Sequence, residues 1–167
     1  MRKIVIDIET TGEKFEKDKI ISLSAIEIDE YCRLTGNVFC SLINPQCRIP
    51  RQISTITGIT QATVKDKPTF SELENNFLCF LENKELVVFD EAQSLNFIYM
   101  ALGFALPNET TIISELANKN PNVKAPSFFD LLNRFDIKGI DTMWHLRPLS
   151  RCHMMAKMYK ELTIKEK

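Results

Sequence analysis

The sequence predicts a mixed α/β fold, a β-sheet flanked by α-helices, in a single domain covering residues 1–167. One observation is that the apolar pattern changes repeatedly between strand-like alternation and helix-like spacing. The other is that 167 residues without repeats, low-complexity tracts or linkers suit one domain with its own core.

The N-terminal part of the chain predicts a three-stranded meander. The strands are expected at Lys3 to Ile8, Ile20 to Asp29 and Leu34 to Ile43. A charged loop follows the first strand, and a turn near Glu30 to Arg33 joins the other two. Pro45 and Pro50 end this part of the sheet.

The rest of the chain predicts helices around one more strand. Thr69 and Glu72 form a capping box, after which apolar residues recur at helical spacing up to Leu81. A short β-branched strand is expected at 86–90. Further helices are expected at about 94–102, at 127–135 and from Pro148 onward, the last burying Leu149, Cys152, Ala156 and Tyr159.

Composition excludes some classes of protein. A net charge of −1 and a pI near 6.2 argue against charge-driven coating of nucleic acid, although a local basic cleft remains compatible with them. The odd cysteine set contains no C-x-x-C spacing, so it predicts reduced thiols rather than a zinc knuckle or disulfide framework. No apolar run is long enough to span a bilayer. We therefore expect a cytoplasmic protein without a membrane partner.

The most informative segment is the first strand, which ends in Asp7-Ile8-Glu9 and continues into Thr10-Thr11-Gly12. Residues i and i+2 of a strand share a face, so Asp7 and Glu9 point the same way. Adjacent carboxylates are costly unless a cation lies between them, and a divalent metal ion is the usual cation. The alternative is two acids at the solvent end of an edge strand, but the flanking apolar run predicts a buried central strand.

Further motifs follow this strand in a fixed order. They are Arg33-Leu34-Thr35-Gly36-Asn37, Ile56-Thr57-Gly58-Ile59-Thr60 and Asp66-Lys67-Pro68-Thr69-Phe70. Together with Asp-x-Glu-Thr-Thr-Gly, they resemble the DEDD superfamily of 3′–5′ exonucleases. Within it the chain is most similar to the DnaQ-like group, the proofreading (epsilon) subunits of bacterial DNA polymerase III. The resemblance covers nearly the whole chain and implies a ribonuclease H-like fold.

The resemblance implies a two-metal hydrolase that uses Mg²⁺ or Mn²⁺. In the family, four carboxylates hold two ions roughly 3.5–4 Å apart and a histidine acts as general base. These groups come from three motifs, Asp-x-Glu, His-Asn-x-x-Phe-Asp and His-x-x-x-x-Asp. Asp7 and Glu9 match the first motif.

The second motif falls on residues 89–94 and is altered. Phe89 stands in place of the family's histidine and Asp90 in place of its asparagine. Ser94 replaces the metal-binding aspartate, and a neutral hydroxyl is a weak ligand for a hard cation. We expect Ser94 to cap the helix that follows instead.

The third motif falls on residues 146–151 and is altered as well. Leu146 replaces the general base, a proton acceptor worth about 10²–10⁴ in rate. Arg151 replaces the last carboxylate, and its guanidinium would compete with a metal ion for the remaining acids. We therefore expect Arg151 to pair with Asp7, Glu9 or both, leaving at most one weakly bound metal ion on these acids.

The pocket for the terminal nucleotide is less altered. In the family it is lined by the turn after the acids and by the Thr-Gly-Ile loop. The resemblance therefore implies nucleotide-binding residues at Thr10, Thr11, Thr57, Gly58 and Ile59. The alternative for the glycines is a role in turn geometry alone.

These observations predict a protein with the exonuclease fold whose catalysis is weak or lost. It would bind a single-stranded DNA or RNA 3′ end, or a protein partner such as a polymerase. One alternative is an active metal-dependent 3′–5′ exonuclease with displaced ligands, so whether the protein is an enzyme stays open at this point. The candidates for such ligands are Asp90, Glu91, Asp141 and His145. Another alternative is a protein-interaction scaffold with no role in nucleic-acid binding.

Overall fold

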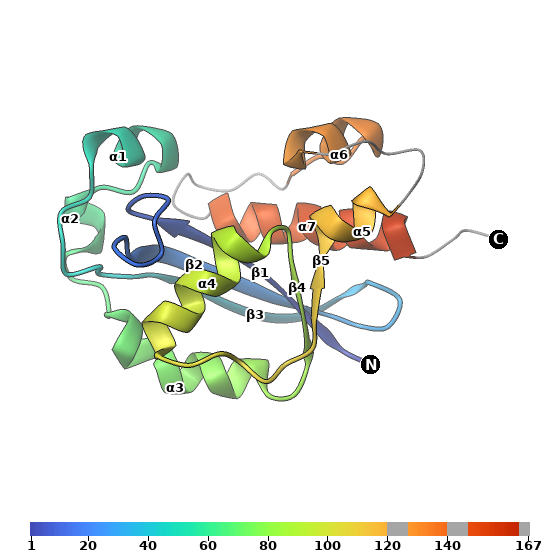
Figure 1. The fold of residues 1–167 in the computed structure, drawn as a ribbon, viewed down its shortest axis with the longest axis horizontal. Helices are drawn as coiled ribbons and strands as arrows, with labels where there is room; N and C mark the ends of the chain where they lie inside the picture. Colours follow the sequence, from blue (N-terminus) through green and yellow to red (C-terminus); the bar gives the residue numbers. More distant parts are fainter. Residues whose placement is uncertain (120–126, 140–146, 164–167) are drawn as a thin grey trace.

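The computed structural model describes residues 1–119, 127–139 and 147–163 and has the predicted mixed sheet with helices on both faces (Figure 1). Its strands are β1 (Lys3–Thr10), β2 (Ile20–Ile28), β3 (Leu34–Leu42), β4 (Glu85–Val88) and β5 (Thr110–Ile112). Its helices are α1 (Arg51–Thr57), α2 (Gln61–Val64), α3 (Phe70–Leu81), α4 (Glu91–Leu102), α5 (Ile113–Asn118), α6 (Phe128–Arg134) and α7 (Arg147–Thr163). Every predicted element is present, α3 with the predicted ends and the others with ends shifted by a few residues, whereas α1, α2, β5 and α5 were not predicted.

β1 is the central strand of the sheet, as the sequence predicted. In the described residues the strand order is β3-β2-β1-β4-β5, with β1 antiparallel to β2 and parallel to β4. The pairing with β4 runs only from Lys3 with Glu85 to Val5 with Val87. The two strands therefore separate before Asp7, and the carboxyl-terminal part of β1 pairs with β2 alone among the described strands.

The two faces of β1 contribute to different cores. Ile4, Ile6 and Ile8 belong to a core that includes residues of α3 and α4. Val5, on the opposite face, belongs to a core that includes residues of α5, α6 and α7. Because side chains alternate along a strand, Asp7 and Glu9 lie on the same face as Val5.

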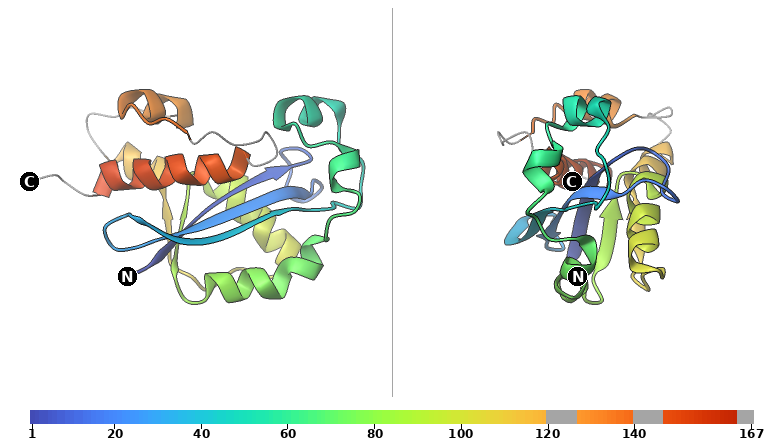
Figure 2. Two further views of the ribbon diagram at one scale, coloured as in Figure 1. Left: turned by 180° about the vertical axis from the view of Figure 1, so that it is seen from behind. Right: turned by 90° about the vertical axis from the view of Figure 1, so that its left-hand side faces the viewer.

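Helix α7 crosses the sheet on this second face, as Figures 1 and 2 show. It packs against β1 and β2 through Cys152, Met155, Ala156 and Tyr159, which are buried. Pro148 lies in its first turn, where a missing backbone N–H costs little. This packing brings the N-terminal end of α7 beside the carboxyl-terminal end of β1 (Figure 1).

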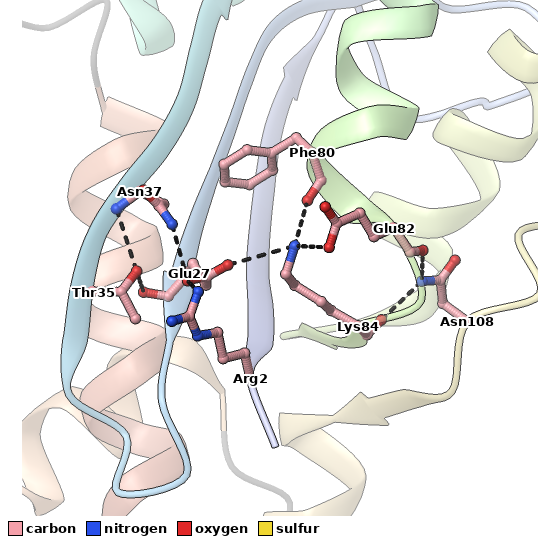
Figure 3. Close-up of polar contacts among 8 residues, drawn as sticks. All are labelled: Arg2, Glu27, Thr35, Asn37, Phe80, Glu82, Lys84 and Asn108. Atoms are coloured by element: carbon pink, nitrogen blue, oxygen red, sulfur yellow. Dashed lines mark hydrogen bonds and ion pairs between the residues drawn. The ribbon is translucent and has the colours of Figure 1, made fainter.

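A group of charges around Glu27 holds the other end of β1 in place (Figure 3). Arg2 and Asn37 both donate to Oε1 of Glu27, each at 3.1 Å. Lys84, in the turn before β4, lies 3.5 Å from Oε2 of Glu27 and donates to Glu82 at 2.7 Å. Burial raises the pKa of Glu27, but these hydrogen bonds and cations outweigh burial and leave the pKa below its usual value. Ionised Glu27 therefore stabilises the fold at neutral pH, and this contribution is lost as the pH falls.

Replacing Lys84 by methionine should lower the free energy of unfolding by about 2 kcal/mol at neutral pH, because a buried carboxylate loses a charged partner. The loss should shrink in acid, where Glu27 becomes protonated. Urea unfolding at several pH values measures both effects. Arg2→Met is the matched control and should cost less than about 1 kcal/mol, because the Arg2 side chain is 61% exposed. An equal loss at all pH values would contradict the assigned role of Lys84.

Candidate functional site

The two acids of the predicted metal site lie together at the end of β1, facing α7. Asp7 is only 5% exposed, and the Glu9 side chain is 16% exposed. Both contact arginines of α7, so the shared face predicted from their i, i+2 spacing is confirmed. Two carboxylates are therefore held beside each other with little access to water.

Arg151 supplies the counter-charge of Asp7. Its Nε donates to Oδ2 of Asp7 at 2.9 Å, a distance typical of a charge-assisted hydrogen bond. The guanidinium also lies over the ring of Phe128, with 3.9 Å from its central carbon to the ring centroid. Phe128 in turn meets Phe89 edge-on, with the ring centroids 5.1 Å apart. The predicted ion pair is present, and an aromatic stack supports it.

Arg147 plays the corresponding part for Glu9, which the sequence analysis missed. Its Nε lies 3.4 Å from Oε1 of Glu9, and its Nη1 donates to the carbonyl of Ile56 at 3.0 Å. The spacing in the sequence indicates this contact: Arg147 and Arg151 are four residues apart, so they share a face of α7. That spacing matches two acids that share a face of a strand.

The arginines do not fully offset burial at these acids. Burial is the largest influence on Asp7 and raises its pKa to about 7, although Arg151 lowers this pKa and Glu9 raises it further. Burial also raises the pKa of Glu9, against the lowering effect of Arg147 and Arg151. Because both pKa values lie above those of an unfolded chain, ionisation of these groups weakens the fold as the pH rises.

The prediction that Ser94 caps its helix is wrong. Helix α4 begins at Glu91, and the residue at its N-cap is Asp90, whose carboxylate accepts from the backbone N–H groups of Ala92 and Gln93. Ser94 lies inside the helix and is buried. Aspartate caps helices as well as serine does, and Asp90 comes earlier in the chain. Asp90 is thus engaged in capping, and it does not line the cavity described below.

The five predicted nucleotide-binding residues have separate surroundings. Thr11 bonds with Asp18 and with the backbone of Lys19, and is buried. Thr57 donates to the carbonyl of Ile53 and accepts from the N–H of Ile59. Gly58 ends α1 with a φ of 72°, where glycine is favoured, and Ile59 is fully buried. Of the five, only Thr10 lines the cavity beside the acids.

A cavity of about 470 Å³ opens where β1 and β4 separate. Its walls combine the two acids, both arginines, polar residues and two aromatic rings. They are Asp7, Ile8, Glu9, Thr10, Gly12, Glu13, Phe15, Ala92, Gln93, Ser94, Phe97, Arg147 and Arg151. The volume is sufficient for a small-molecule ligand.

The residues of this cavity do not fit the two metal ions that the family implies. Two carboxylates, those of Asp7 and Glu9, lie beside α7, and each has an arginine within ion-pair distance. Ser94 offers only a neutral hydroxyl. In the described ranges, no three side chains of histidine, cysteine, aspartate or glutamate are grouped as metal ligands. Leu146, Asp141 and His145 lie outside the described residues.

Comparison with known proteins agrees with this architecture. The exonuclease family RNase_T matches residues 4–146. The epsilon subunit of DNA polymerase III from Escherichia coli strain K12 is 34% identical over 175 residues, covering 97% of this chain and 71% of the subunit. The epsilon subunit of Buchnera aphidicola is 31% identical over 176 residues, with 97% and 71% covered. The chain therefore belongs to the exonuclease family, and within it to the DnaQ-like group.

Solved structures show the same fold. Exonuclease X in complex with 5′ overhanging duplex DNA has a TM-score of 0.75 at 21% identity, covering 96% of this chain and 90% of that protein. The nuclease domain of 3′hExo bound to rAMP has a TM-score of 0.79 at 14% identity, with the same coverage. The predicted ribonuclease H-like fold is confirmed. In the ranges described, no helix is long and apolar enough to cross a membrane.

Asp90→Ala should lower the free energy of unfolding by about 1 kcal/mol, because α4 loses its N-cap. Asp90→Asn should be close to neutral, since asparagine caps equally well. Denaturant unfolding with and without Mn²⁺ measures both variants. If Asp90→Asn removed a stabilisation by Mn²⁺, Asp90 would be a displaced metal ligand rather than a cap.

Arg151→Ala should lower the free energy of unfolding by about 2 kcal/mol near pH 8, because Asp7 loses its charged partner and must take up a proton to stay buried. The loss should be smaller near pH 5. There a carboxyl with a pKa of about 7 is already protonated and needs no counter-charge.

Arg151→Met is the matched variant, because it keeps much of the contact with Phe128 while removing the charge. Thermal and urea unfolding of both variants at the two pH values separate packing from charge. An Arg151→Met variant as stable as the original at high pH would show that the ion pair contributes nothing.

Proposed function

We propose that this chain is an exonuclease-fold protein that binds a single-stranded nucleic-acid 3′ end with little or no hydrolysis. The observation that carries this proposal is the 2.9 Å contact between Nε of Arg151 and Oδ2 of Asp7. A guanidinium with fixed charge at this carboxylate competes with any divalent cation for the same oxygen atoms. Hydrolysis by the family's chemistry needs those oxygen atoms as metal ligands.

The residue at position 146 and the contacts of Asp90 also support weak or lost hydrolysis. Leucine at position 146 has no group that could accept a proton, and a general base contributes about 10²–10⁴ to rate. The carboxylate of Asp90 caps α4, which argues against its use as a replacement ligand. Glu91, Asp141 and His145 remain the candidates for an alternative, active centre.

The cavity supports continued binding of a ligand. It keeps Thr10 and Gly12 from the turn after the acids, and Phe15 and Phe97 add aromatic surface to its walls. Aromatic side chains are the usual stacking partners of bases in single strands. Two similar structures contain duplex DNA and rAMP respectively, which supports a nucleic-acid ligand here.

A protein partner is the second candidate function. The relatives are subunits of DNA polymerase III, and edge strand β3 exposes Leu34 and Val38 by about half of their surface. An unpaired strand edge with apolar side chains favours contact with another chain. Co-purification with a polymerase that persists in Leu34→Glu and Val38→Glu variants would argue against this edge.

Cleavage of an end-labelled single strand with Mg²⁺ or Mn²⁺ should not differ between the original protein and Asp7→Ala. The reason is that Asp7 has no metal-dependent step to support. The same strand should still bind, as measured by fluorescence anisotropy. A clear fall in the cleavage rate in Asp7→Ala would show that the centre is active, and absence of strand binding would refute the proposal itself.

The combined variant Ser94→Asp, Leu146→His and Arg151→Asp serves as the positive control. It returns the three replaced catalytic positions to the family's residue types, so the stability of the variant should become dependent on Mn²⁺. A gain in cleavage would then locate the original loss at these positions.

A further inference from the structure

We propose that Arg147 binds a phosphate group of the nucleic acid directly, so that strand binding in this cavity needs no divalent cation. This inference rests on the proposed function, because it assigns the ligand group at the same site. A planar guanidinium with a fork of N–H donors suits phosphate well. The two arginines of α7 differ in how firmly the protein holds them.

Contacts within the protein hold the side chain of Arg151. Its contact with Asp7 is short at 2.9 Å, its guanidinium lies on the ring of Phe128, and its side chain is only 17% exposed. Turning Arg151 towards a ligand would break the ion pair of a buried carboxylate and uncover an aromatic ring. Such a change is costly, so Arg151 is a poor candidate for a ligand contact.

Arg147 is held more loosely and reaches solvent. Its Nε lies 3.4 Å from Glu9, longer than the 2.7–2.9 Å of a strong charge-assisted hydrogen bond. Its side chain is 35% exposed and lines the cavity. Nη1 donates to the carbonyl of Ile56, and the contact with Glu9 is made through Nε. Arg147 can therefore donate to a ligand while keeping its contact with Ile56.

The charge balance of the cavity also permits an anion. Asp7 and Glu9 face two guanidiniums, so these four groups carry no formal net charge when all are ionised. The remaining acid on the cavity wall, Glu13, is exposed, and water screens its charge. A phosphate entering beside Arg147 therefore meets a cation without first needing metal ions to neutralise the acids.

The contact with Ile56 adds a positional argument. Ile56 directly precedes the Thr57-Gly58-Ile59 segment, so Arg147 joins the end of α1 to Glu9 of β1. A phosphate bound at Arg147 would lie beside these two elements, in the cavity whose wall also includes the aromatic rings of Phe15 and Phe97. This arrangement suits a nucleotide better than a free inorganic anion, because base and phosphate would have separate contacts.

The test is binding of a labelled short oligothymidylate, measured by anisotropy in a chelator and again in excess Mg²⁺. At matched ionic strength, the dissociation constant in Mg²⁺ should be no lower than in the chelator, because binding does not need the metal ion. Arg147→Met should weaken binding by about 10- to 100-fold, the effect of losing one charged hydrogen-bonding contact. The slope of log affinity against log salt should also become shallower by about 0.7, as for the loss of one phosphate contact on a single strand.

Arg134→Met is the matched control, because Arg134 is an exposed arginine of α6 that does not line the cavity. It removes the same charge and should change the affinity much less. Arg147→Lys keeps the charge without the fork and should bind with intermediate affinity. If Arg147→Met does not fold in a thermal melt, Arg147→Lys and the chelator titration decide the question.

Several results would overturn the inference while leaving the proposed function intact. They are strand binding that requires Mg²⁺, unchanged binding in Arg147→Met, or tighter binding in that variant, which would make Arg147 an obstruction. Equal displacement of the strand by inorganic phosphate and by thymidine monophosphate would overturn the assignment of a nucleotide ligand. Absence of any strand binding would instead refute the proposed function.

Discussion

The ion pair between Asp7 and Arg151 is the interaction on which the rest of the site depends. Asp7 is buried at the end of the central strand, where an unpaired carboxylate is costly. Arg151 meets this need from α7, and its other face packs on Phe128 of α6. One charge thus links β1, α7 and α6, and Phe89 extends this contact because its ring packs edge-on against Phe128.

A buried carboxylate lies at each end of β1, and the pKa values of the two shift in opposite directions. Glu27 has hydrogen bonds and two nearby cations, and its pKa falls below the usual value despite burial. Asp7 has one close cation and a neighbouring acid, and its pKa rises to about 7. The Glu27 end is therefore arranged for stability. The Asp7 end keeps two acids together at a cost in stability, as functional sites commonly do.

The sequence predicted an element well where the pattern of apolar residues extends over many positions. Helix α3, with its capping box and twelve residues, was placed correctly. Helix α2 has four residues and β5 has three, and segments this short carry too little periodicity to detect. The family register predicted the contact of Arg151 with Asp7, but it could not predict local roles. The N-cap of α4 is Asp90, whereas Ser94 was expected there. The position of the cap depends on where the backbone leaves the preceding strand.

Two of the replaced positions, Phe89 and Arg151, are connected through the ring of Phe128. Returning Arg151 alone to aspartate would place three acids together, remove the cation over Phe128 and leave Phe89 packed against that ring. Arg147 would still lie beside Glu9 and compete for its oxygen atoms. A single reversion should therefore destabilise the protein without creating a metal site, since the charge, the aromatic stack and the second arginine all favour the same arrangement. Among the described residues, the positive charge beside Asp7 and Glu9 therefore comes from the guanidinium groups of Arg147 and Arg151.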